Sequence, residues 1–399
     1  MSSLYCLFAA SSSSIGRRDL PPFLIQSSTI AMPVNTAAWL AAAKANPLEV
    51  RSAPYTSPGE NQIVIKNGAV AINPIDWIKQ EMGDVAISWI KYPFILGSDV
   101  AGEVMEVGSA VTRFKVGDRV VGHALGTAEK FNKSSQTAFQ TYTVLLAHMA
   151  SRIPITMPYE NAAVLPLGLS TAACGLFQKD HLGLQYPSTS PKPTGKTVLI
   201  WGGSTSVGSN AIQLAVAAGY EVITTASPRN FDYVKKLGAS QVFDYNSNTV
   251  VDDVIYAFKG KTTAGALSIC QGGAEACLDI VDKCEGNKFV SMASYPVRHP
   301  RPKHFIFLST VVYYVSWIII NWIKSRARNI GTKFIFASSL VDNGVGKAVY
   351  VDFLDKALTE GKYVAAPDPH VIGKGLEFIQ TGFEFQKKGM SAKKVVVSL

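Results

Sequence analysis

Short runs of alternating hydrophobic and polar residues fill the chain between about residues 60 and 155. Segments such as QIVIKNGAVA, LGSDVAGEVMEV and QTYTVL alternate in this way, and glycine or proline turns separate them. Closely spaced short strands of this kind are typical of a compact β-rich barrel. The last segment of the sequence, KKVVVSL, is predicted to add one more strand.

The pattern changes after Pro158. A stretch rich in small residues, ENAAVLPLGLSTAACGLF, is predicted to be helical, and a linker of Pro, Ser and Thr follows it. Beyond the linker, apolar strands alternate with helices, and a further helix is expected near residues 345–360. The strands are predicted at 197–201, 221–226 and 241–243, and the helices at 207–218 and 230–237. Continuous apolar strands separated by helices predict a parallel, doubly wound α/β sheet.

A turn rich in glycine and serine joins the first strand of this α/β region to its first helix. Glycines allow the backbone to approach a pyrophosphate, whose charge is stabilised by the N–H groups at the start of the helix. Thr205 stands where a third glycine is usual, which weakens the motif. The strand–turn–helix–strand setting nevertheless favours cofactor binding over a purely structural turn. The residues that provide the turn and its hydroxyl donors are Gly202, Gly203, Ser204, Thr205, Ser206 and Gly208.

The end of the second strand indicates which nucleotide is bound. An Asp or Glu at this place would bind an adenosine ribose hydroxyl and repel a 2′-phosphate. The sequence has Ser227, Arg229 and Asn230 instead, which can pair with a phosphate or donate hydrogen bonds to it. We therefore expect NADP(H), with a solvated turn at Arg229 as the alternative.

The charge of the chain is concentrated in one stretch. The net charge is +9, from 38 Lys and Arg against 29 Asp and Glu. Eight of those cations and no acidic residue lie between Glu285 and Asp342, so the rest of the chain has 30 cations against 29 anions. Because nucleic-acid binders spread cations along a face, no nucleic-acid partner is expected. Five cysteines make no disulfide framework, which favours a reducing, cytoplasmic location.

Two segments need separate interpretation. Residues 1–31 are rich in serine, and an over-extended start with the true start at Met32 is favoured over a mitochondrial transit segment. The run from Phe305 to Ile323 has 19 residues without a charge and is bracketed by Lys303 and Lys324. As a helix it would be about 28 Å long, just enough to cross a bilayer core.

Taken together, the motifs resemble those of the medium-chain dehydrogenase/reductase superfamily. They are INPIDW, PFILGSDVAGEVMEVG, VGDRVVGHA, LPLGLSTAACGLF, GGSTSVG, SPRNFDYVKKLGASQVFDY and KGMSAKKVVVSL. The sequence is most similar to a fungal branch of zinc-free enoyl reductases, which includes trans-acting enoyl reductases of polyketide pathways and ToxD-like oxidoreductases. The resemblance runs from about Met32 to Leu399 and is interrupted at roughly 300–330.

This resemblance implies a domain organisation and a set of site residues. It implies a GroES-like β-rich catalytic domain, residues 32–170 plus 345–399, and a Rossmann NADP-binding domain, residues 171–344, with a hydrophobic insertion at about 300–330. The nicotinamide and substrate pocket would be lined by Pro74, Asp76, Trp77, Thr171, Met292, Ala293 and the strand FIFASSL. The rest of the cofactor would contact Ser204, Thr205, Ser206, Val207, Ser227, Arg229, Asn230, Tyr245 and Ser391.

No metal is expected in this protein. Relatives that carry zinc place a Cys shortly before an Asp, and a His-Glu after a glycine, whereas this chain has Asn73-Pro74-Ile75-Asp76 and Gly97-Ser98-Asp99. Cys270, Cys277 and Cys284 are seven residues apart, so on a helix neighbours would be about 10 Å distant, too far to share one zinc. They are interpreted as small buried apolar residues.

Without zinc, no Lewis acid polarises a carbonyl for alcohol oxidation. Hydride transfer from a nicotinamide to a conjugated enone, enoyl thioester or quinone remains, with a small-molecule or carrier-bound enoyl substrate. Lys79 and Tyr142 are the best proton-donor candidates, although each also fits a surface or packing role. Asp76 is expected to hold its own turn, and His123 to be structural. A quinone reductase and a non-catalytic nucleotide-binding or membrane-associated protein are the alternatives, as a monomer or homodimer.

The apolar run must be reconciled with this resemblance. If Phe305 to Ile323 crossed a bilayer, residues 331–399 would be separated from the fold to which the resemblance assigns them, so a span is disfavoured. In relatives a short loop is expected before FIFASSL, so the segment in this chain is interpreted as an insertion. It is interpreted as a translated retained intron, or next as a flap over the substrate. The third interpretation is an interfacial anchor at anionic lipid, the one route to membrane contact.

Overall fold

The computed structural model describes residues 33–294 and 306–399. Contacts between residues divide the chain into Met1–Pro33 and Val34–Leu399, and all the helices and strands below belong to the second unit. The predicted extension at 1–31 and residues 300–305 of the predicted insertion lie outside the described residues.

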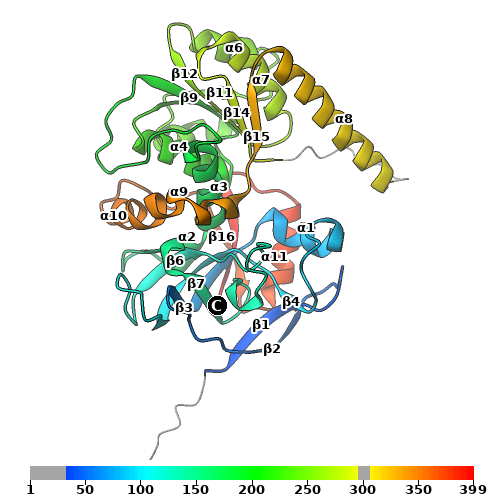
Figure 1. The fold of residues 1–399 in the computed structure, drawn as a ribbon, viewed down its shortest axis with the longest axis vertical. Coiled ribbons are helices and arrows are strands. Elements are labelled where there is room, and N and C mark those ends of the chain that lie inside the picture. Colours follow the sequence, from blue (N-terminus) through cyan, green and yellow to red (C-terminus); the bar gives the residue numbers. More distant parts are fainter. Residues whose placement is uncertain (1–32, 295–305) are drawn as a thin grey trace, which may run out of the picture. The chain divides into compact units, whose positions relative to one another are not determined.

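The segments that alternate in the sequence build an antiparallel-rich, seven-stranded sheet, drawn in the lower half of Figure 1. Its order is β16-β17-β3-β5-β6-β8, with β7 paired to β3. The strands are β3 (Gln62–Ala71), β5 (Asp99–Val107), β6 (Arg119–His123), β7 (Tyr142–Leu146), β8 (Ala150–Arg152), β16 (Asp368–Lys374) and β17 (Lys393–Ser398). The predicted β-rich region and the predicted closing strand are thus confirmed.

A small second sheet and three helices complete this half. The sheet has the order β2-β1-β4, from Glu49–Ala53, Asn35–Leu40 and Phe94–Ile95. The helices are α1 (Pro74–Met82), α2 (Tyr159–Ala163) and α11 (Phe378–Lys387). The core between these elements contains Ile63, Ile65, Val100 and Phe383, all with 0% exposure. Consecutive residues of β3, β5 and β17 are buried, so both faces of the large sheet contribute apolar side chains to the core.

The second large sheet, in the upper half of Figure 1, is parallel and has the order β11-β10-β9-β12-β14-β15. Its strands are β9 (Lys196–Trp201), β10 (Glu221–Ala226), β11 (Gln241–Asp244), β12 (Thr262–Ser268), β14 (Phe289–Met292) and β15 (Gly331–Phe334), and β13 (Glu285–Gly286) pairs with β12. Its helices are α4 (Ser206–Ala217), α5 (Phe231–Lys236), α6 (Val250–Ala257), α7 (Gly273–Lys283) and α8 (Ile306–Ala327). This confirms the doubly wound α/β prediction.

Two predicted elements differ from the structure. The single helix expected at 345–360 is divided into α9 (Gly344–Gly346), a π-helical turn (Lys347–Val351) and α10 (Leu354–Thr359). The strand expected over FIFASSL ends at Phe334, and a 3₁₀ helix (Ala337–Asp342) follows it.

Helix α3 (Pro166–Phe177) packs against α4 and runs through residue 170, where the domain boundary was predicted. The division into domains stays a prediction.

The connection between β14 and β15 contains the segment that the sequence predicts to be an insertion. The two strands run parallel, with Phe289 opposite Gly331 and Met292 opposite Phe334. A parallel pair needs a crossover that returns the chain to the starting edge, and a short loop cannot span that length. Helix α8 lies in this crossover and packs on α7 and β15. Within residues 33–294 and 306–399, no helix is long and apolar enough to cross a membrane.

Candidate active site

The glycine turn after β9 brings the backbone very close to its neighbours. Gly202 has a φ of +92°, a conformation that favours glycine. A Cβ at Gly203 would lie 2.2 Å from Thr224 Oγ1, and one at Gly208 would lie 2.2 Å from the Gly202 carbonyl oxygen. All three positions therefore require glycine, as the sequence predicts for a turn that packs tightly beneath a phosphate.

Thr205 is the N-cap of α4, which explains its departure from glycine. Its Oγ1 accepts a hydrogen bond from Gly208 N at 3.0 Å and donates one to the Gly202 carbonyl at 2.8 Å. Ser206 Oγ, in the first turn of α4, is buried and has no hydrogen-bond partner within the described structure. An orphan hydroxyl and free N–H groups at this helix N-terminus fit a dinucleotide phosphate.

Four of the residues predicted to contact the cofactor form two hydrogen-bonded pairs. Ser227 Oγ, after β10, lies 3.3 Å from Tyr245 Oη, after β11. Asn230 Nδ2 donates to Ser391 Oγ at 2.9 Å, although these residues are 161 positions apart in the sequence. Arg229 has no ion-pair partner among the described residues, so its guanidinium is free to meet an anion.

Asp76 holds the start of α1, as expected. Asn73 is the N-cap, and its backbone N–H donates to Asp76 Oδ2 at 2.8 Å. Burial raises the pKa of Asp76 to about 7, although the hydrogen bond from the Asn73 backbone lowers it; the nearby Asp99 carboxylate adds a smaller rise. Trp77 Nε1 donates to Gln386 Oε1 of α11, which fixes the indole. Pro74, at the first helical position, needs no N–H partner there.

A buried ion pair that the sequence did not predict lies beside this turn. Lys394 Nζ, on β17, is 2.7 Å from Asp99 Oδ2, on β5, and donates to Asn73 Oδ1 at 2.7 Å. Asp99 also accepts from Asn73 Nδ2 at 2.9 Å and from Leu167 N at 2.6 Å. Asp99 and Lys394 are 0% and 6% exposed. No local signal marks the pair, because its members are distant in the sequence.

A second buried network reaches α3. His123 Nδ1 lies 2.9 Å from Ser170 Oγ, which lies 2.8 Å from Tyr350 Oη, and Tyr350 Oη donates to the Pro166 carbonyl at 3.0 Å. Burial lowers the pKa of His123 to about 4 and raises that of Tyr350 well above its usual range. His123 is therefore neutral, in keeping with the expected structural role.

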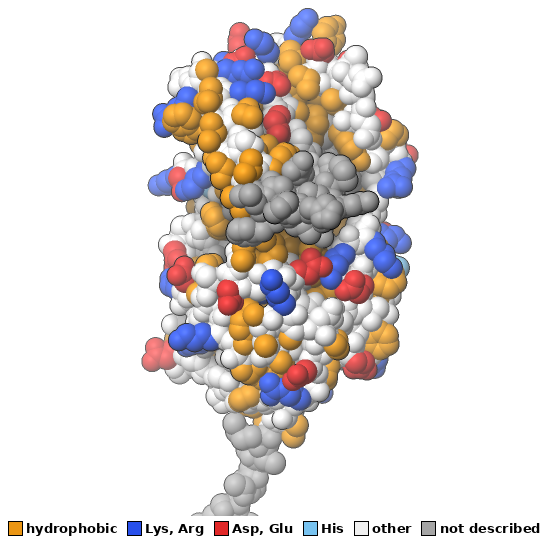
Figure 2. All heavy atoms as spheres, turned by 90° about the vertical axis from the view of Figure 1, so that its right-hand side faces the viewer, with side chains coloured by type: hydrophobic (Ala, Val, Ile, Leu, Met, Phe, Trp, Pro, Cys, Tyr) orange, Lys and Arg blue, Asp and Glu red, His pale blue; other side chains and the backbone are white. Residues whose placement is uncertain are grey.

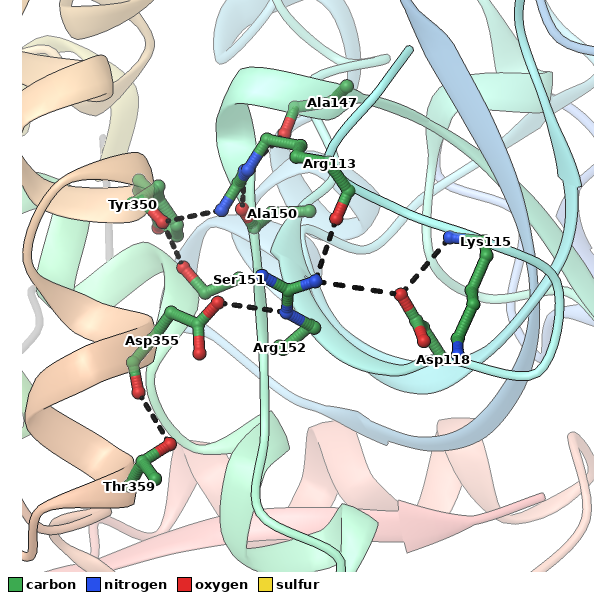
Figure 3. Close-up of polar contacts among 10 residues, drawn as sticks. All are labelled: Arg113, Lys115, Asp118, Ala147, Ala150, Ser151, Arg152, Tyr350, Asp355 and Thr359. Atoms are coloured by element: carbon green, nitrogen blue, oxygen red, sulfur yellow. Dashed lines mark hydrogen bonds and ion pairs between the residues drawn. The ribbon is translucent and has the colours of Figure 1, made fainter.

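The backbone of Tyr350 is clamped from the barrel side, as Figure 3 shows. Its carbonyl accepts from Ser151 Oγ at 2.5 Å and from Arg113 at 3.3 Å. Arg113 also donates to the carbonyls of Ala147 and Ala150 (Figure 3). These contacts fix the π-helical turn against β8, so that the Tyr350 hydroxyl is held at Ser170.

The proton-donor candidates Lys79 and Tyr142 and the predicted pocket residue Thr171 come from three different elements, and no described contact joins them. Lys79 on α1 is fully buried, and its Nζ donates to the carbonyls of Gly83 and Ile87 and to Asp84. Thr171 on α3 donates from Oγ1 to the Leu167 carbonyl at 2.7 Å. Tyr142 on β7 is half-buried with an edge contact to Tyr55 at 5.2 Å.

The three evenly spaced cysteines differ in exposure. Cys277 and Cys284 are buried as expected, but Cys270 is exposed, because it lies in a turn with a φ of +76° before α7 begins. Over the described ranges, no three His, Cys, Asp or Glu side chains gather in a way that would hold a metal. Asn73, at the place of the relatives' cysteine, and Asp99, next to Ser98 at the place of their histidine, both contact the Lys394 ammonium, which does not fit a divalent cation there.

An open cavity of about 810 Å³ lies on the barrel, away from the glycine turn. Its lining includes Lys66, Glu103, Glu160 and Lys374, and none of the predicted site residues. The cavity therefore gives no information on the predicted cofactor site.

The fold and the turn define an oxidoreductase: a GroES-like barrel beside a parallel nucleotide-binding sheet. Residues 59–155 match the alcohol dehydrogenase GroES-like domain, and residues 206–283 match the zinc-binding dehydrogenase domain. The chain belongs to the medium-chain dehydrogenase/reductase superfamily, in its fungal branch.

Two fungal relatives are similar over nearly their whole length. Dehydrogenase pigH of Monascus ruber is 61% identical over 369 residues, which cover 92% of this chain and 100% of that protein. Trans-enoyl reductase himH of Aspergillus japonicus is 38% identical over 369 residues, covering 92% of this chain and 98% of that protein. Such similarity extends well beyond the cofactor turn.

Solved structures show the same fold at lower identity. The CurK enoyl reductase has a TM-score of 0.68 and 19% identity, over 91% of this chain and 99% of that chain. A mycobacterial protein complexed with NADPH has a TM-score of 0.63 and 19% identity, over 92% of this chain and 100% of that chain. Both support the assignment of the architecture.

Proposed function

We propose that the protein is an NADPH-dependent reductase that transfers a hydride to the C=C bond of an α,β-unsaturated carbonyl or enoyl thioester, without zinc. The Asn73–Asp99–Lys394 network carries this proposal. The Lys394 ammonium lies between Asn73, at the place of the relatives' cysteine, and Asp99, which follows Ser98 at the place of their histidine. This ammonium opposes a second cation, so no Lewis acid would be available to activate an alcohol. A conjugated acceptor accepts a hydride without one.

The choice of NADP(H) is supported by the end of β10. No carboxylate stands there, and Ser227, Arg229 and Asn230 offer donors with Tyr245 and Ser391 beside them. Arginine pairs strongly with phosphate, so this group suits a 2′-phosphate. The mycobacterial structural neighbour complexed with NADPH supports the same choice.

The residues of the chain would bind and orient the cofactor and the substrate, and bound NADPH would supply the hydride. The N-terminus of α4, with Ser206 Oγ, would hold the pyrophosphate. The Pro74–Trp77 segment and Thr171 would line the nicotinamide pocket, in a catalytic domain formed by residues 32–170 and 345–399. Asp76 and Trp77 are held by hydrogen bonds with Asn73 and Gln386, so this side of the proposed pocket is rigid before the substrate binds.

The α-carbon of the substrate must then gain a proton. Lys79 donates to three acceptors around its own turn and Thr171 donates to Leu167, whereas no acceptor is described for the Tyr142 hydroxyl. Tyr142 is therefore the first donor candidate to test. A Tyr142→Phe variant would lower kcat and keep NADPH affinity if the hydroxyl gives the proton.

The decisive experiment is a panel of enones, enoyl thioesters and quinones, each incubated with NADPH and the full chain. Loss of nicotinamide absorbance with an enone or enoyl thioester, unchanged by a zinc chelator, supports the proposal. Turnover restricted to quinones would instead indicate a quinone reductase. Binding of NADPH with no turnover of any compound would contradict the enzyme and favour a non-catalytic nucleotide-binding protein.

A further inference from the structure

Helix α8 buries two polar residues against the protein and leaves most of its large aliphatic residues exposed. Asn321 and Ser325, on the side that packs against the protein, are only 6% and 3% exposed. Their side chains donate to carbonyls of α8 itself, from Asn321 Nδ2 to Trp317 and from Ser325 Oγ to Trp322. A helix that covers a protein core normally turns apolar residues inward. Trp317 packs against the core on the same side, while the large aliphatic residues of α8 and Trp322 face outward.

The outward side of α8 carries a continuous group of large apolar side chains. Trp322 is 58% exposed, and Ile320 and Ile323 are each 53% exposed. Figure 2 views the side of the molecule on which α8 lies in Figure 1, and hydrophobic side chains gather in its upper half. The apolar face of α8 consists of Val311, Val312, Val315, Ile318, Ile319, Ile320, Trp322 and Ile323.

The width of this apolar face indicates the kind of partner. Ile318, Ile319 and Ile320 are consecutive, and at 3.6 residues per turn they cover an arc of about 200° around the helix. A partner helix contacts only a narrow stripe of every third or fourth residue. A fluid apolar layer, in contrast, contacts a broad arc along the whole length of a helix that lies in it.

The charges beside the apolar face select an anionic partner. Lys324 and Arg326 follow it directly, and neither has an acidic partner within the described part of the chain. Arg328 and Lys333, by comparison, pair with Asp279 and Asp180. No acidic residue occurs between Glu285 and Asp342. A second copy of the same face would offer no carboxylate to Lys324 and Arg326, whereas anionic lipid offers phosphate and carboxylate groups.

We propose that α8 docks the protein on an anionic lipid surface. The helix lies in the plane of the interface, with its apolar face among the acyl chains and with Lys324 and Arg326 at the headgroups. Trp322 occupies the boundary, where amphipathic aromatic rings are favoured, and the Arg326 guanidinium lies 5.9 Å from its ring centre. This inference goes beyond the proposed reductase activity and does not depend on it.

Flotation of the full chain with lipid vesicles tests the proposal. We expect binding to vesicles of equimolar phosphatidylcholine and phosphatidylserine, and much weaker binding to phosphatidylcholine alone. Raising the salt from about 0.1 M to about 1 M shortens the Debye length from about 10 Å to about 3 Å, so binding should fall. Lys324→Gln/Arg326→Gln should lower the partition coefficient about thirty-fold, since each cation contributes about 1 kcal/mol near such a surface and 1.4 kcal/mol is tenfold.

Two further variants distinguish binding through the apolar face of α8 from nonspecific adsorption to the vesicles. Ile319→Ser/Ile323→Ser should also reduce binding, while Lys235→Gln/Lys236→Gln, two exposed lysines on α5, should leave it unchanged. Near-ultraviolet circular dichroism checks that each variant is folded. Absence of binding to the phosphatidylserine vesicles, or equal binding by all variants, overturns the proposal. So does a concentration-dependent dimer that Ile319→Ser/Ile323→Ser abolishes in the absence of vesicle binding, because the face would then be covered by a second copy.

Discussion

Replacing Lys394 with methionine tests the network on which the metal-free proposal rests. The change would leave the Asp99 carboxylate buried with only Asn73 Nδ2 and Leu167 N as partners. The lost contact is the 2.7 Å pair between Lys394 Nζ and Asp99 Oδ2, at a carboxylate with 0% exposure. Removing one member of a buried ion pair costs about 3–5 kcal/mol, because the other charge stays desolvated. We expect a loss of this size in the free energy of unfolding of Lys394→Met.

Urea unfolding followed by circular dichroism gives this free energy. Lys393→Met is the matched control, because Lys393 is the preceding residue of β17 and its side chain is exposed; its effect should stay within about 0.5 kcal/mol. The double variant Asp99→Asn/Lys394→Met should recover a large part of the loss, because an amide keeps an acceptor for Leu167 N and removes the unpaired charge. If Lys394→Met were no more destabilising than Lys393→Met, the account of a buried, coupled pair would be refuted.

Three further changes test the turn, the cofactor choice and the buried carboxyl. Thr205→Ala should cost about 1 kcal/mol of unfolding free energy through loss of the α4 N-cap, and Thr205→Ser should restore it in the same urea assay. Ser227→Asp should lower the ratio of kcat/KM for NADPH over NADH by at least about tenfold, because a carboxylate there repels a 2′-phosphate; an unchanged ratio would contradict the assignment. Asp76 has its pKa raised to about 7 by burial, so the folded state binds its proton more tightly and this stabilisation is lost as the pH rises from about 4 to about 7. Asp76→Asn should therefore remove a decline in stability over that window, and an identical pH profile of unfolding midpoints in the variant would count against it.

The parts of the fold predicted from the sequence are those with local signals. The strand at 221–226 was predicted with the bounds of β10, because a continuous apolar run between turns specifies a buried strand. The Gly202–Gly208 turn was found for a similar reason, since its glycines and hydroxyls are adjacent in the chain.

The other features depend on contacts between distant segments. Asn73 and Lys394 are separated by 321 positions, and nothing in either segment indicates that they meet. The sequence predicts an insertion between β14 and β15, but it does not show that α8 belongs to a crossover, because the parallel direction of these strands depends on their pairing. The exposure of Cys270 depends on where α7 begins, and element boundaries are set by tertiary contacts as well as by propensity.

The position of β17 in the barrel sheet also constrains how the chain acquires its structure during synthesis. β17 lies between β16 and β3, yet the whole parallel sheet is translated between β3 and β17. The ribosome therefore produces every strand of the nucleotide-binding sheet before the barrel can receive its interior strand. Because domains generally fold in the order of their synthesis, the nucleotide-binding half would be folded while the barrel sheet still lacks β17 beside β3. That edge, along β3, is where chaperone binding to the nascent chain would be most expected.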